Sequence, residues 1–355
     1  MRAAPTIAAP ERAEADRDDE RRAFLAAAGG GAHTLVALPA DASPRRYFRL
    51  AGAGLMLMDA APGAADLPPF LAVAAHLGRL GLSAPRVIAA DAARGLALIE
   101  DLGDGTFTRL IAGGHDEWAL YALAVDALVA LHRAPEGAAI AVPAYDAAAL
   151  EAETALFADW YVPAVAPGLA AEPARLARFR RDFLAAFDAA LADVATRREA
   201  LVLRDFHVDN LMVVDGRTGV AACGLLDFQD ALVGARAYDL VSLTEDARRD
   251  LAPGLAEAMV ERYLAAMPEI DHGLFLTDYA LLAAQRHAKV AGIFERLARR
   301  DGKTRYRAHI PRVVGLLDRA LARAGLGAIA DLVDAHAPGW RTYPPAAQAH
   351  PEHTP

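Results

Sequence analysis

The sequence of 355 residues has little lysine, a single cysteine and no long apolar run. Only Lys289 and Lys303 are lysines, so no lysine in the N-terminal half can hold a phosphate group. The single cysteine, Cys223, excludes an internal disulfide and a zinc site built from several cysteines. No apolar run reaches the roughly 18 residues that span a bilayer, and residues 1–20 lack the apolar segment of a signal peptide. We therefore expect a cytoplasmic protein with no membrane partner.

The charge balance is acidic, with 46 acidic against 37 basic residues and a formal net charge of −9. Such a chain gains little from the field of a polyanion, so we expect no nucleic-acid partner. Apolar residues make up 55% of the sequence, which is enough for a large core. At roughly 150 residues per domain, the length predicts two domains or one large bilobal enzyme. We infer no obligate protein partner from the composition.

The first hundred residues predict a small, mostly antiparallel sheet with two helices. Residues 1–10 are expected to form a disordered tail, and a charged helix over Glu11–Ala28 is expected to end at glycines 29–31. Apolar runs separated by turn residues then indicate five strands, with a helix over Leu67–Leu80 between the third and the fourth. The strands are expected over Thr34–Leu38, Arg46–Leu50, Leu55–Met58, Arg86–Ala90 and Leu96–Glu100.

Beyond residue 100 the sequence becomes largely helical. The polar, glycine-containing segment 101–105 indicates a hinge. A short β island interrupts the helices, with apolar runs over Leu201–Leu203, Leu211–Val214 and Ala221–Leu226. The tail 338–355, rich in proline and histidine, is expected to be loose. The helices are expected over Glu117–His132, Ala147–Tyr161, Pro173–Ala195, Pro253–Met267, Leu274–Arg300 and Tyr306–Ala324.

These elements predict an α+β fold of two lobes. The N-lobe, residues 11–100, is expected to be a small antiparallel sheet. The C-lobe, residues 106–337, is expected to be larger and mainly helical, with the β island carrying a polar loop.

That loop is crowded with ionisable and polar side chains. Asp205 and Asn210 have the spacing Asp-x-x-x-x-Asn between two apolar strands, and Asp227 follows the end of the next strand. Phosphoryl transfer needs positioning, metal ions that neutralise phosphate charge, and a carboxylate that orients the attacking hydroxyl. Oxygen ligands from asparagine and aspartate suit Mg²⁺ better than zinc. The pattern therefore favours phosphoryl transfer from ATP with Mg²⁺.

A single aspartate after a strand is more often a turn former than a catalyst. On this island, however, several polar residues converge, which favours a functional site. The converging residues are Arg204, Asp205, His207, Asp209, Asn210, Asp227 and Asp230.

These same residues carry a family resemblance. The stretch Leu203–Asn210, followed by Leu226–Asp230 and by Gly234 and Tyr238–Leu240, resembles the aminoglycoside phosphotransferase family of small-molecule kinases. The resemblance covers about residues 20–325 and implies the bilobal protein-kinase-like fold. It implies that the N-lobe, residues 11–100, binds the nucleotide and that the C-lobe, residues 106–337, carries the catalytic loop and the sugar-acceptor site. Finer strings are similar to one branch, the anomeric N-acetylmuramate/N-acetylglucosamine kinases of bacterial cell-wall recycling. These strings are DASPRRYFR at 41–49, LMDAAP at 57–62, LDFQD at 226–230 and QRHAKV at 285–290.

The resemblance implies a role for each of several residues. Asp205 would be the catalytic base, and Asn210 and Asp227 would hold Mg²⁺. Asp239 would support the catalytic loop. The other implied positions are the hinge backbone at Glu100 and Leu102 for adenine, Ser43, Arg45, Arg46 and Arg49 for the phosphates of ATP, and Arg204, His207, Asp209 and Arg286 for the acceptor.

One departure from the family pattern concerns the lysine that binds the phosphates of ATP in the N-lobe. The third strand of the family carries a lysine that pairs with a glutamate on the next helix, whereas Leu55–Asp59 has no lysine and Leu67–Leu80 has no glutamate. Arg45, Arg46 and Arg49 are the available substitutes, because arginine binds phosphate bidentately and stays charged. In a strand, Arg45 and Arg49 share one face and Arg46 lies on the other. The alternative is a solvated arginine cluster on an edge strand.

The resemblance implies a sugar kinase that phosphorylates the anomeric hydroxyl of N-acetylmuramate and N-acetylglucosamine to the 1-phosphate, in peptidoglycan recycling. A kinase for another hydroxyl compound, such as an aminoglycoside, choline or homoserine, is a first alternative. A nucleotide-binding pseudokinase is a second alternative, prompted by the absent lysine. The retained Asp205, Asn210 and Asp227 argue against the pseudokinase.

Overall fold

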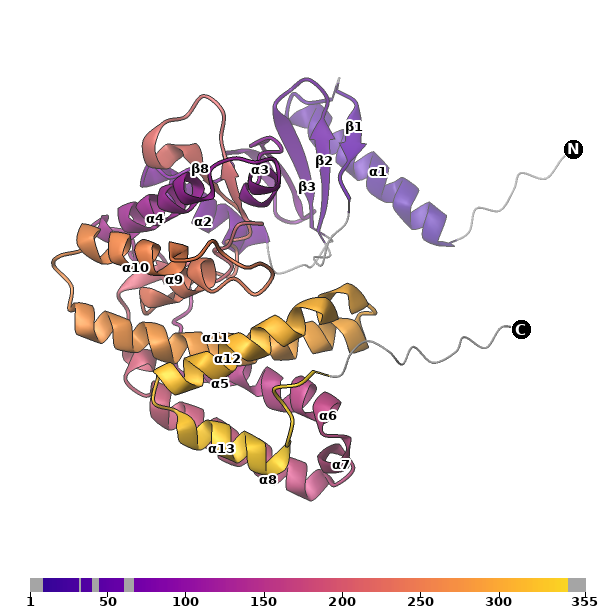
Figure 1. Ribbon diagram of the computed structural model, residues 1–355. Coiled ribbons are helices and arrows are strands. Elements are labelled where there is room, and N and C mark those ends of the chain that lie inside the picture. The colour runs from indigo at the N-terminus through magenta and orange to yellow at the C-terminus, as the bar shows by residue number, and fades with distance from the viewer. Residues whose placement is uncertain (1–8, 32, 40–44, 61–66, 344–355) are drawn as a thin grey trace, which may run out of the picture. The chain divides into compact units, whose positions relative to one another are not determined.

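The computed structural model describes residues 9–31, 33–39, 45–60 and 67–343, and these residues form two compact units (Figure 1). The sheet unit contains the described residues within Met1–Asp116 and Val208–Ala231. The helical unit contains those within Glu117–His207 and Leu232–Pro355. This division assigns 106–116 and 208–231 to the sheet unit, whereas the sequence had placed both segments in the helical lobe.

The sheet unit is built on a five-stranded antiparallel sheet in the order β1-β2-β3-β5-β4. The register of β2 on β3 runs from Arg46 opposite Asp59 to Leu50 opposite Leu55. All five predicted strands form, with ends within one residue of those predicted. Their bounds are β1 Leu35–Ala37, β2 Arg46–Leu50, β3 Leu55–Asp59, β4 Val87–Asp91 and β5 Leu96–Glu100.

The helix α1 (Ala9–Ala27) packs on the sheet and ends before Gly29, whose φ of +80° is a left-handed conformation that glycine tolerates. Phe24 and Leu25 of α1 form a core cluster with apolar side chains of β2, β3 and β5. Arg21 is buried with its guanidinium 4.6 Å from the Phe48 ring centre. The second predicted helix is α2 (Leu67–Arg79).

A hairpin of two further strands completes the sheet unit. Strands β7 (Leu211–Val213) and β8 (Cys223–Leu225) pair antiparallel, with Met212 opposite Gly224. A Cβ atom on Gly224 would lie 2.8 Å from Val214 Cγ2, so only glycine fits this close approach. The short helix α3 (Phe107–Ala112), which the sequence did not indicate, lies against β7 because Thr106 forms a bridge with Met212.

The helical unit has a second small ribbon and most of the helices. Strand β6 (Ala200–Val202) pairs with β9 (Leu232–Gly234), a strand that the sequence did not predict. The predicted β island is therefore two separate two-stranded ribbons. The α-helices of this unit are α4 Glu117–Arg133, α5 Ala147–Leu156, α6 Val162–Val165, α7 Pro167–Ala170, α8 Pro173–Leu191, α9 Ala237–Thr244, α10 Leu255–Ala266, α11 His272–Arg300, α12 Ile310–Arg323 and α13 Gly327–His336.

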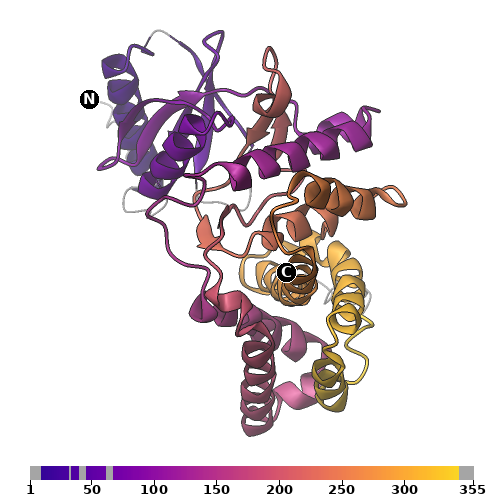
Figure 2. The same cartoon turned by 90° about the vertical axis from the view of Figure 1, so that its left-hand side faces the viewer.

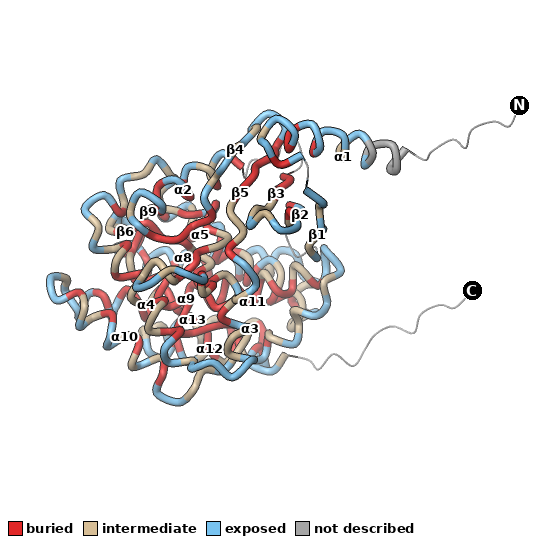
Figure 3. Tube along the Cα trace, turned by 90° about the horizontal axis from the view of Figure 1, so that it is seen from above, coloured by how far each residue is buried: buried red, intermediate tan, exposed pale blue. Residues whose placement is uncertain are grey.

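The long helix α11 is the centre of the helical unit. It packs against α12, as Figures 1 and 2 show, and also against α5 and α9. Every residue of α9 is buried (Figure 3). A Cβ atom on Gly292 of α11 would lie 2.2 Å from the carbonyl oxygen of Leu156, so glycine permits the close contact between α11 and the end of α5.

The C-terminal part of the described chain packs on this unit. Trp340, inside the segment expected to be loose, is buried, and its indole Nε1–H donates to Asp334 at 2.9 Å. Residues 344–355 lie outside the described residues. Among the helices that the structure describes, none is both long and apolar enough to cross a membrane.

Candidate active site

A hollow of about 370 Å³ in the sheet unit gathers several of the predicted nucleotide-binding residues. Apolar side chains line one part of it, including those of Met56, Ile99 and Met212. Such walls suit the flat face of a purine base. The predicted residues that line the hollow are Arg45, Arg49, Glu100, Leu102, Asn210 and Asp227.

Arg45 is buried beside the predicted metal ligands. Its Nη2 donates to Asp227 Oδ1 at 2.7 Å, and its Nη1 donates to Gln229 Oε1 at 2.8 Å. Gln229 also donates to Asp227 at 3.1 Å. A guanidinium held in this way is presented to the hollow in a fixed orientation, which is what recognition of a phosphate requires.

The two arginines of β2, Arg46 and Arg49, lie on opposite faces of the strand. Arg49 lines the hollow and forms ion pairs with Asp101 and Asp104. These two carboxylates, Asp104 first, raise the pKa of Arg49. Arg46 instead donates to Glu14 of α1 and lies over the Phe48 ring. Arg46, predicted to bind phosphate, thus faces the helix and not the hollow.

The predicted hinge follows β5. The backbone N–H of Glu100 donates to the carbonyl of Arg86 at 2.8 Å, and its side chain forms ion pairs with Arg217 and Arg86. Burial opposes ionisation of Glu100, but the two arginines outweigh it and lower the pKa of this carboxyl. The carboxylate of Glu100 is therefore paired with two arginines, and Glu100 and Leu102 both line the hollow. Ser43, the remaining nucleotide-binding prediction, lies outside the described residues.

Asn210 and Asp227 lie at the start and the end of the β7–β8 hairpin. The Leu226 N–H donates to the Asn210 carbonyl at 3.0 Å, which holds these two ends of the hairpin together. Asp227 has a φ of +57°, a strained conformation for a non-glycine residue and one that is frequent at functional sites. The side chain of Asp227 is 41% exposed.

The donor set of this hollow fits Mg²⁺. No group of three or more histidine, cysteine or acidic residues arranged as a metal site occurs among the described residues. Mg²⁺ is usually bound by one or two protein oxygens together with substrate phosphates and water, so a carboxylate and an amide are sufficient. The residues that would hold the ion are Asn210 and Asp227.

The catalytic loop leaves β6 through a tight turn in the helical unit. Arg204 has a φ of +70°, and a buried carboxylate holds this conformation. Asp239 of α9 accepts hydrogen bonds from the backbone N–H groups of Leu203 at 2.6 Å and Arg204 at 2.9 Å. Burial raises the pKa of Asp239 to about 7, against the effect of these hydrogen bonds. Asp239 is therefore placed to support the loop.

Asp205 follows directly and is half-buried. Burial opposes its ionisation, but the positive charges of Lys289, His207, Arg286 and Arg204 outweigh burial and lower the pKa of the Asp205 carboxyl. A carboxylate that is charged at neutral pH can accept a hydrogen bond or a proton from an acceptor hydroxyl.

The residues predicted to bind the acceptor divide between the two units. His207 Nε2 lies 3.3 Å from Arg248 Nη1, and burial lowers the pKa of His207. Arg286 is buried and donates from Nη2 to Ser242 Oγ at 2.5 Å. Arg204 pairs with Glu153. Asp209 belongs to the sheet unit, where it accepts a hydrogen bond from Thr108.

The sequence did not reveal Glu153, which pairs with Arg204 of the predicted catalytic loop, or its partner Lys289. Glu153 and Lys289 form a buried ion pair of 2.8 Å, although they are 136 residues apart in the sequence. Two signals could have revealed Lys289: it is one of only two lysines, and it lies in the string QRHAKV at 285–290 that carries part of the resemblance. Glu153 carries no comparable signal.

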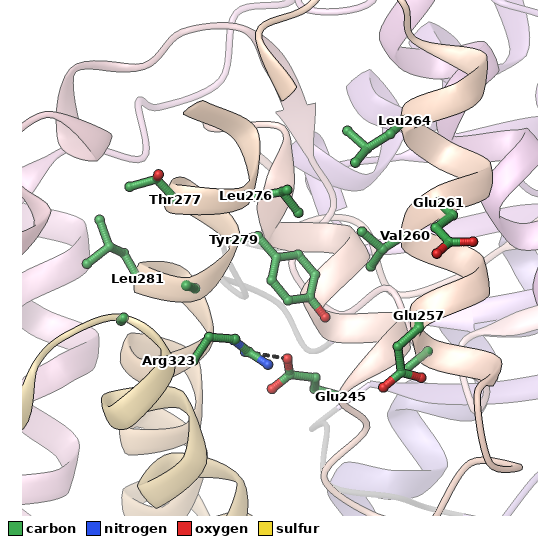
Figure 4. Close-up of a pocket in the computed structure, with 13 residues that line it drawn as sticks. Glu245, Glu257, Val260, Glu261, Leu264, Leu276, Thr277, Tyr279, Leu281 and Arg323 are labelled. Carbon is green, nitrogen blue, oxygen red and sulfur yellow. Dashed lines mark hydrogen bonds and ion pairs between the residues drawn. The ribbon is translucent and has the colours of Figure 1, made fainter. Parts of the chain in front are cut away.

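The helical unit also contains an open groove of about 690 Å³ among α10, α11 and the end of α12 (Figure 4). Glu245 and Arg323 form an ion pair at one end of it, and Tyr279 points into it. None of the residues predicted for catalysis or binding lines this groove.

Comparison with known proteins decides the family. The model of a family described as the phosphotransferase enzyme family (APH) matches residues 34–274. The chain belongs to this family. An N-acetylmuramate/N-acetylglucosamine kinase of Caulobacter vibrioides is 36% identical over 364 residues, covering 91% of this chain and 97% of the relative. A Pseudomonas aeruginosa protein of the same name is 36% identical over 299 residues, covering 81% of this chain and 84% of the relative.

Solved structures of the family confirm the fold. A choline/ethanolamine kinase family protein from Mesorhizobium loti has a TM-score of 0.57 at 17% identity, covering 92% of this chain and 99% of that one. The GDP complex of an aminoglycoside 2′-phosphotransferase has a TM-score of 0.59 at 16% identity, covering 87% and 99%. The predicted family, the protein-kinase-like fold and the assignment as a phosphotransferase are thus confirmed.

Proposed function

We propose that this phosphotransferase transfers the γ-phosphate of ATP to the anomeric hydroxyl of N-acetylmuramate and N-acetylglucosamine, giving the sugar 1-phosphate for peptidoglycan recycling. The observation that carries the proposal is 36% identity to a kinase named for these two sugars, over 91% of this chain. A reaction that uses ATP as the donor would take place in the cytoplasm, which is the compartment we propose.

The hollow of the sheet unit supports ATP as the donor. Its apolar walls suit adenine, and the backbone at Glu100 and Leu102 would meet the base edge. Arg45 and Arg49 would contact the phosphates in place of the absent lysine, because they are the cations of β2 and its preceding residue that line the hollow. Arg45 has the stronger claim, since it is buried and adjoins Asp227.

Asn210 and Asp227 would hold Mg²⁺ together with the phosphates of ATP. When bound, the ion neutralises the charge on the transferred phosphoryl group. Arg45 already contacts Asp227 at 2.7 Å, so the cation, the carboxylate and the phosphates would form one charged cluster.

Asp205 would orient the acceptor. The anomeric oxygen forms a bond to the γ-phosphorus while the bond from phosphorus to the leaving oxygen of ADP breaks, and the hydroxyl proton passes to the Asp205 carboxylate. An anomeric hydroxyl is more acidic than an ordinary sugar alcohol, so a carboxylate with a lowered pKa is a sufficient base. His207, Arg286 and Arg204 help to lower the pKa of Asp205. Asp209 follows four residues later in the same loop.

A cationic acceptor is the main alternative, because choline kinases and aminoglycoside phosphotransferases share the fold. A polycationic acceptor favours a pocket lined by carboxylates. The charges that act most strongly on Asp205 include those of Lys289, Arg286 and Arg204, which favours an acceptor that is neutral or anionic, such as an N-acetyl sugar or its lactyl ether.

The test is release of ADP from ATP and Mg²⁺ with a panel of acceptors. The panel contains N-acetylmuramate, N-acetylglucosamine, glucose, kanamycin, choline and homoserine. Turnover on the two N-acetyl sugars, well above that on glucose, is expected. Turnover on kanamycin or choline alone would agree with the family assignment but contradict the proposed substrate. Nucleotide binding without any turnover would support a pseudokinase.

A further inference from the structure

The side chain of Gln229 is buried and contacts two residues of the hollow in the sheet unit, Arg45 and Asp227. Gln229 Oε1 accepts from Arg45 Nη1 at 2.8 Å, and Gln229 Nε2 donates to Asp227 Oδ1 at 3.1 Å. Arg45 Nη2 donates to the same Oδ1 at 2.7 Å. The three side chains therefore form a closed ring of hydrogen bonds, called the Gln229 ring below. Gln229 itself is not among the described residues that line the hollow, so any effect on a ligand there passes through its two partners.

An amide suits this position because the ring needs an acceptor and a donor at the same time. A guanidinium only donates hydrogen bonds and an ionised carboxylate only accepts them, whereas the amide of Gln229 does both. Its Nε2 also donates to Asp230 Oδ2 at 3.2 Å. A glutamate in place of Gln229 could accept from Arg45, but it could not donate to Asp227 and would add a like charge beside it. The amide therefore joins a cation and an anion without adding a charge of its own.

Contacts with α2 fix the backbone that carries Gln229. The preceding residue, Phe228, is buried, and its ring stacks on the ring of Phe70 of α2 with 5.2 Å between the ring centres. The Ala231 N–H donates to the Phe228 carbonyl at 3.0 Å, which closes a turn over 228–231. These contacts hold the backbone of the Gln229 ring in one arrangement, so the ring is a fixed part of the sheet unit.

We propose that Gln229 is a positioning residue of the phosphoryl transfer: its amide fixes the Arg45 guanidinium, which would contact the phosphates of ATP, against the Asp227 carboxylate, which would hold Mg²⁺. The inference rests on the proposed roles of Arg45 and Asp227. Two groups that contact the same complex of Mg²⁺ and ATP bind it more tightly when their mutual geometry is set beforehand, because less freedom is lost on binding. Both hydrogen bonds of the ring to Asp227 end on Oδ1, so Oδ2 is the oxygen that the ion would take.

Calorimetry with the Mg²⁺ complex of AMPPNP, a non-hydrolysable analogue of ATP, tests the proposal without any acceptor. Gln229→Met removes both hydrogen bonds of the amide and should raise Kd about 3- to 30-fold, because Arg45 and Asp227 are then oriented less well. Gln229→Leu is the second variant, in case Gln229→Met does not fold, and it should weaken binding by a similar factor. Thermal unfolding verifies that each variant is folded. A wild-type Kd in a folded variant would overturn the proposal.

A double-mutant cycle separates the positioning of Arg45 from a merely structural role. Arg45→Met should itself weaken binding, and adding Gln229→Met should then raise Kd by a factor at least about threefold smaller than in the wild-type background, because the bond between the two residues is already lost. The control background is Arg94→Met, an exposed arginine that pairs with Asp91 in the turn before β5, and there Gln229→Met should have its full effect. A structural role would weaken binding equally in all three backgrounds, and that result would overturn the proposal.

The outcomes keep this inference apart from the proposed function. If Arg45→Met weakens binding and Gln229→Met does not, the phosphate-binding role of Arg45 stands and the inference about Gln229 fails. If Arg45→Met binds the analogue as the wild type does, Arg45 does not bind phosphate, and both the inference and that part of the proposed function are overturned. The acceptor panel decides the sugar substrate separately, since calorimetry uses no acceptor.

Discussion

At the scale of single residues, Arg45 is the side chain with the strongest claim to replace the phosphate-binding lysine that the third strand lacks. The sequence indicated that Arg45, Arg46 or Arg49 replaces a phosphate-binding lysine, and strand alternation correctly separated Arg46 from the other two. It could not choose between Arg45 and Arg49. The choice depends on Asp227 and Gln229, which lie more than 180 residues away and hold Arg45 in place.

Arg45→Gln should therefore weaken binding of ATP. A charge-assisted hydrogen bond is worth about 1.5–3 kcal/mol, so KM for ATP should rise about 10- to 100-fold, with a smaller effect on KM for the acceptor. Steady-state kinetics with ATP varied at saturating acceptor measures this. Arg94→Gln, in the turn between β4 and β5, is the matched control and should behave like wild type. An unchanged KM in Arg45→Gln would contradict a phosphate-binding role.

Asp205→Asn tests the proposed base. Asparagine keeps the size of the side chain but cannot take a proton, so kcat should fall about 10²- to 10⁴-fold while KM for ATP changes little. Asp215→Asn, in an exposed turn of the hairpin loop, should leave kcat unchanged. Rapid-quench measurement of the chemical step would show whether the loss lies there, and a near-normal rate in Asp205→Asn would remove the catalytic assignment.

At the scale of secondary-structure elements, the flanking turn residues explain which predictions hold. Strands β2 and β5 have the predicted bounds, because a turn at 51–54 follows β2 and a turn at 92–95 precedes β5. Strand β9 was not predicted because its three residues form a strand only by pairing with β6, and helix α3 was not predicted because its six residues make fewer than two helical turns. The buried ion pair of Glu153 and Lys289 escaped prediction because its two members come from α5 and α11, which are far apart in the sequence.

Gly292 tests the packing of α11 on α5. Gly292→Ala would place a Cβ atom 2.2 Å from the Leu156 carbonyl oxygen, so the helices must separate, and we expect a loss of about 2–3 kcal/mol in the free energy of unfolding. Gly315→Ala on α12 is the control, because its Cβ atom would meet only Arg319, at 3.5 Å. The gain in helix propensity should stabilise that variant by about 0.5–1 kcal/mol. Urea denaturation measures both, and equal effects would contradict the close approach.

Glu153 links the same two helices through its charge, which predicts a pH dependence. Burial opposes its ionisation, but Lys289 and Arg204 lower its pKa from 4.5 to about 2. Its contribution to stability is therefore complete above about pH 4.5 and is lost as the pH falls towards 2. Thermal unfolding of wild type and Glu153→Gln should show a difference in Tm that is constant from pH 5 to 7 and shrinks below about pH 4.

Glu151→Gln, an exposed position two residues earlier on α5, should show no such difference. A Tm difference between wild type and Glu153→Gln that persists undiminished at about pH 3 would mean that the carboxylate charge of Glu153 does not stabilise the fold.

At the scale of the whole molecule, the chain passes between its two units three times, after Asp116, His207 and Ala231. Asp205 therefore belongs to the helical unit, while Asn210 and Asp227 belong to the sheet unit. Sequence spacing predicts a role for these residues because a polar loop between apolar strands is a local signal. It could not show the division, because the contacts that assign each residue to its unit are not local.

The most direct measurement is the position of the phosphate in the product. The enzyme is incubated with ATP, Mg²⁺ and N-acetylmuramate, and the product is examined by ³¹P–¹H correlation NMR. Transfer to the anomeric hydroxyl predicts a single phosphorus resonance that correlates with the proton on C1 of the sugar. A correlation with any other sugar proton, or no phosphorylated sugar while another acceptor is turned over, would contradict the proposed function.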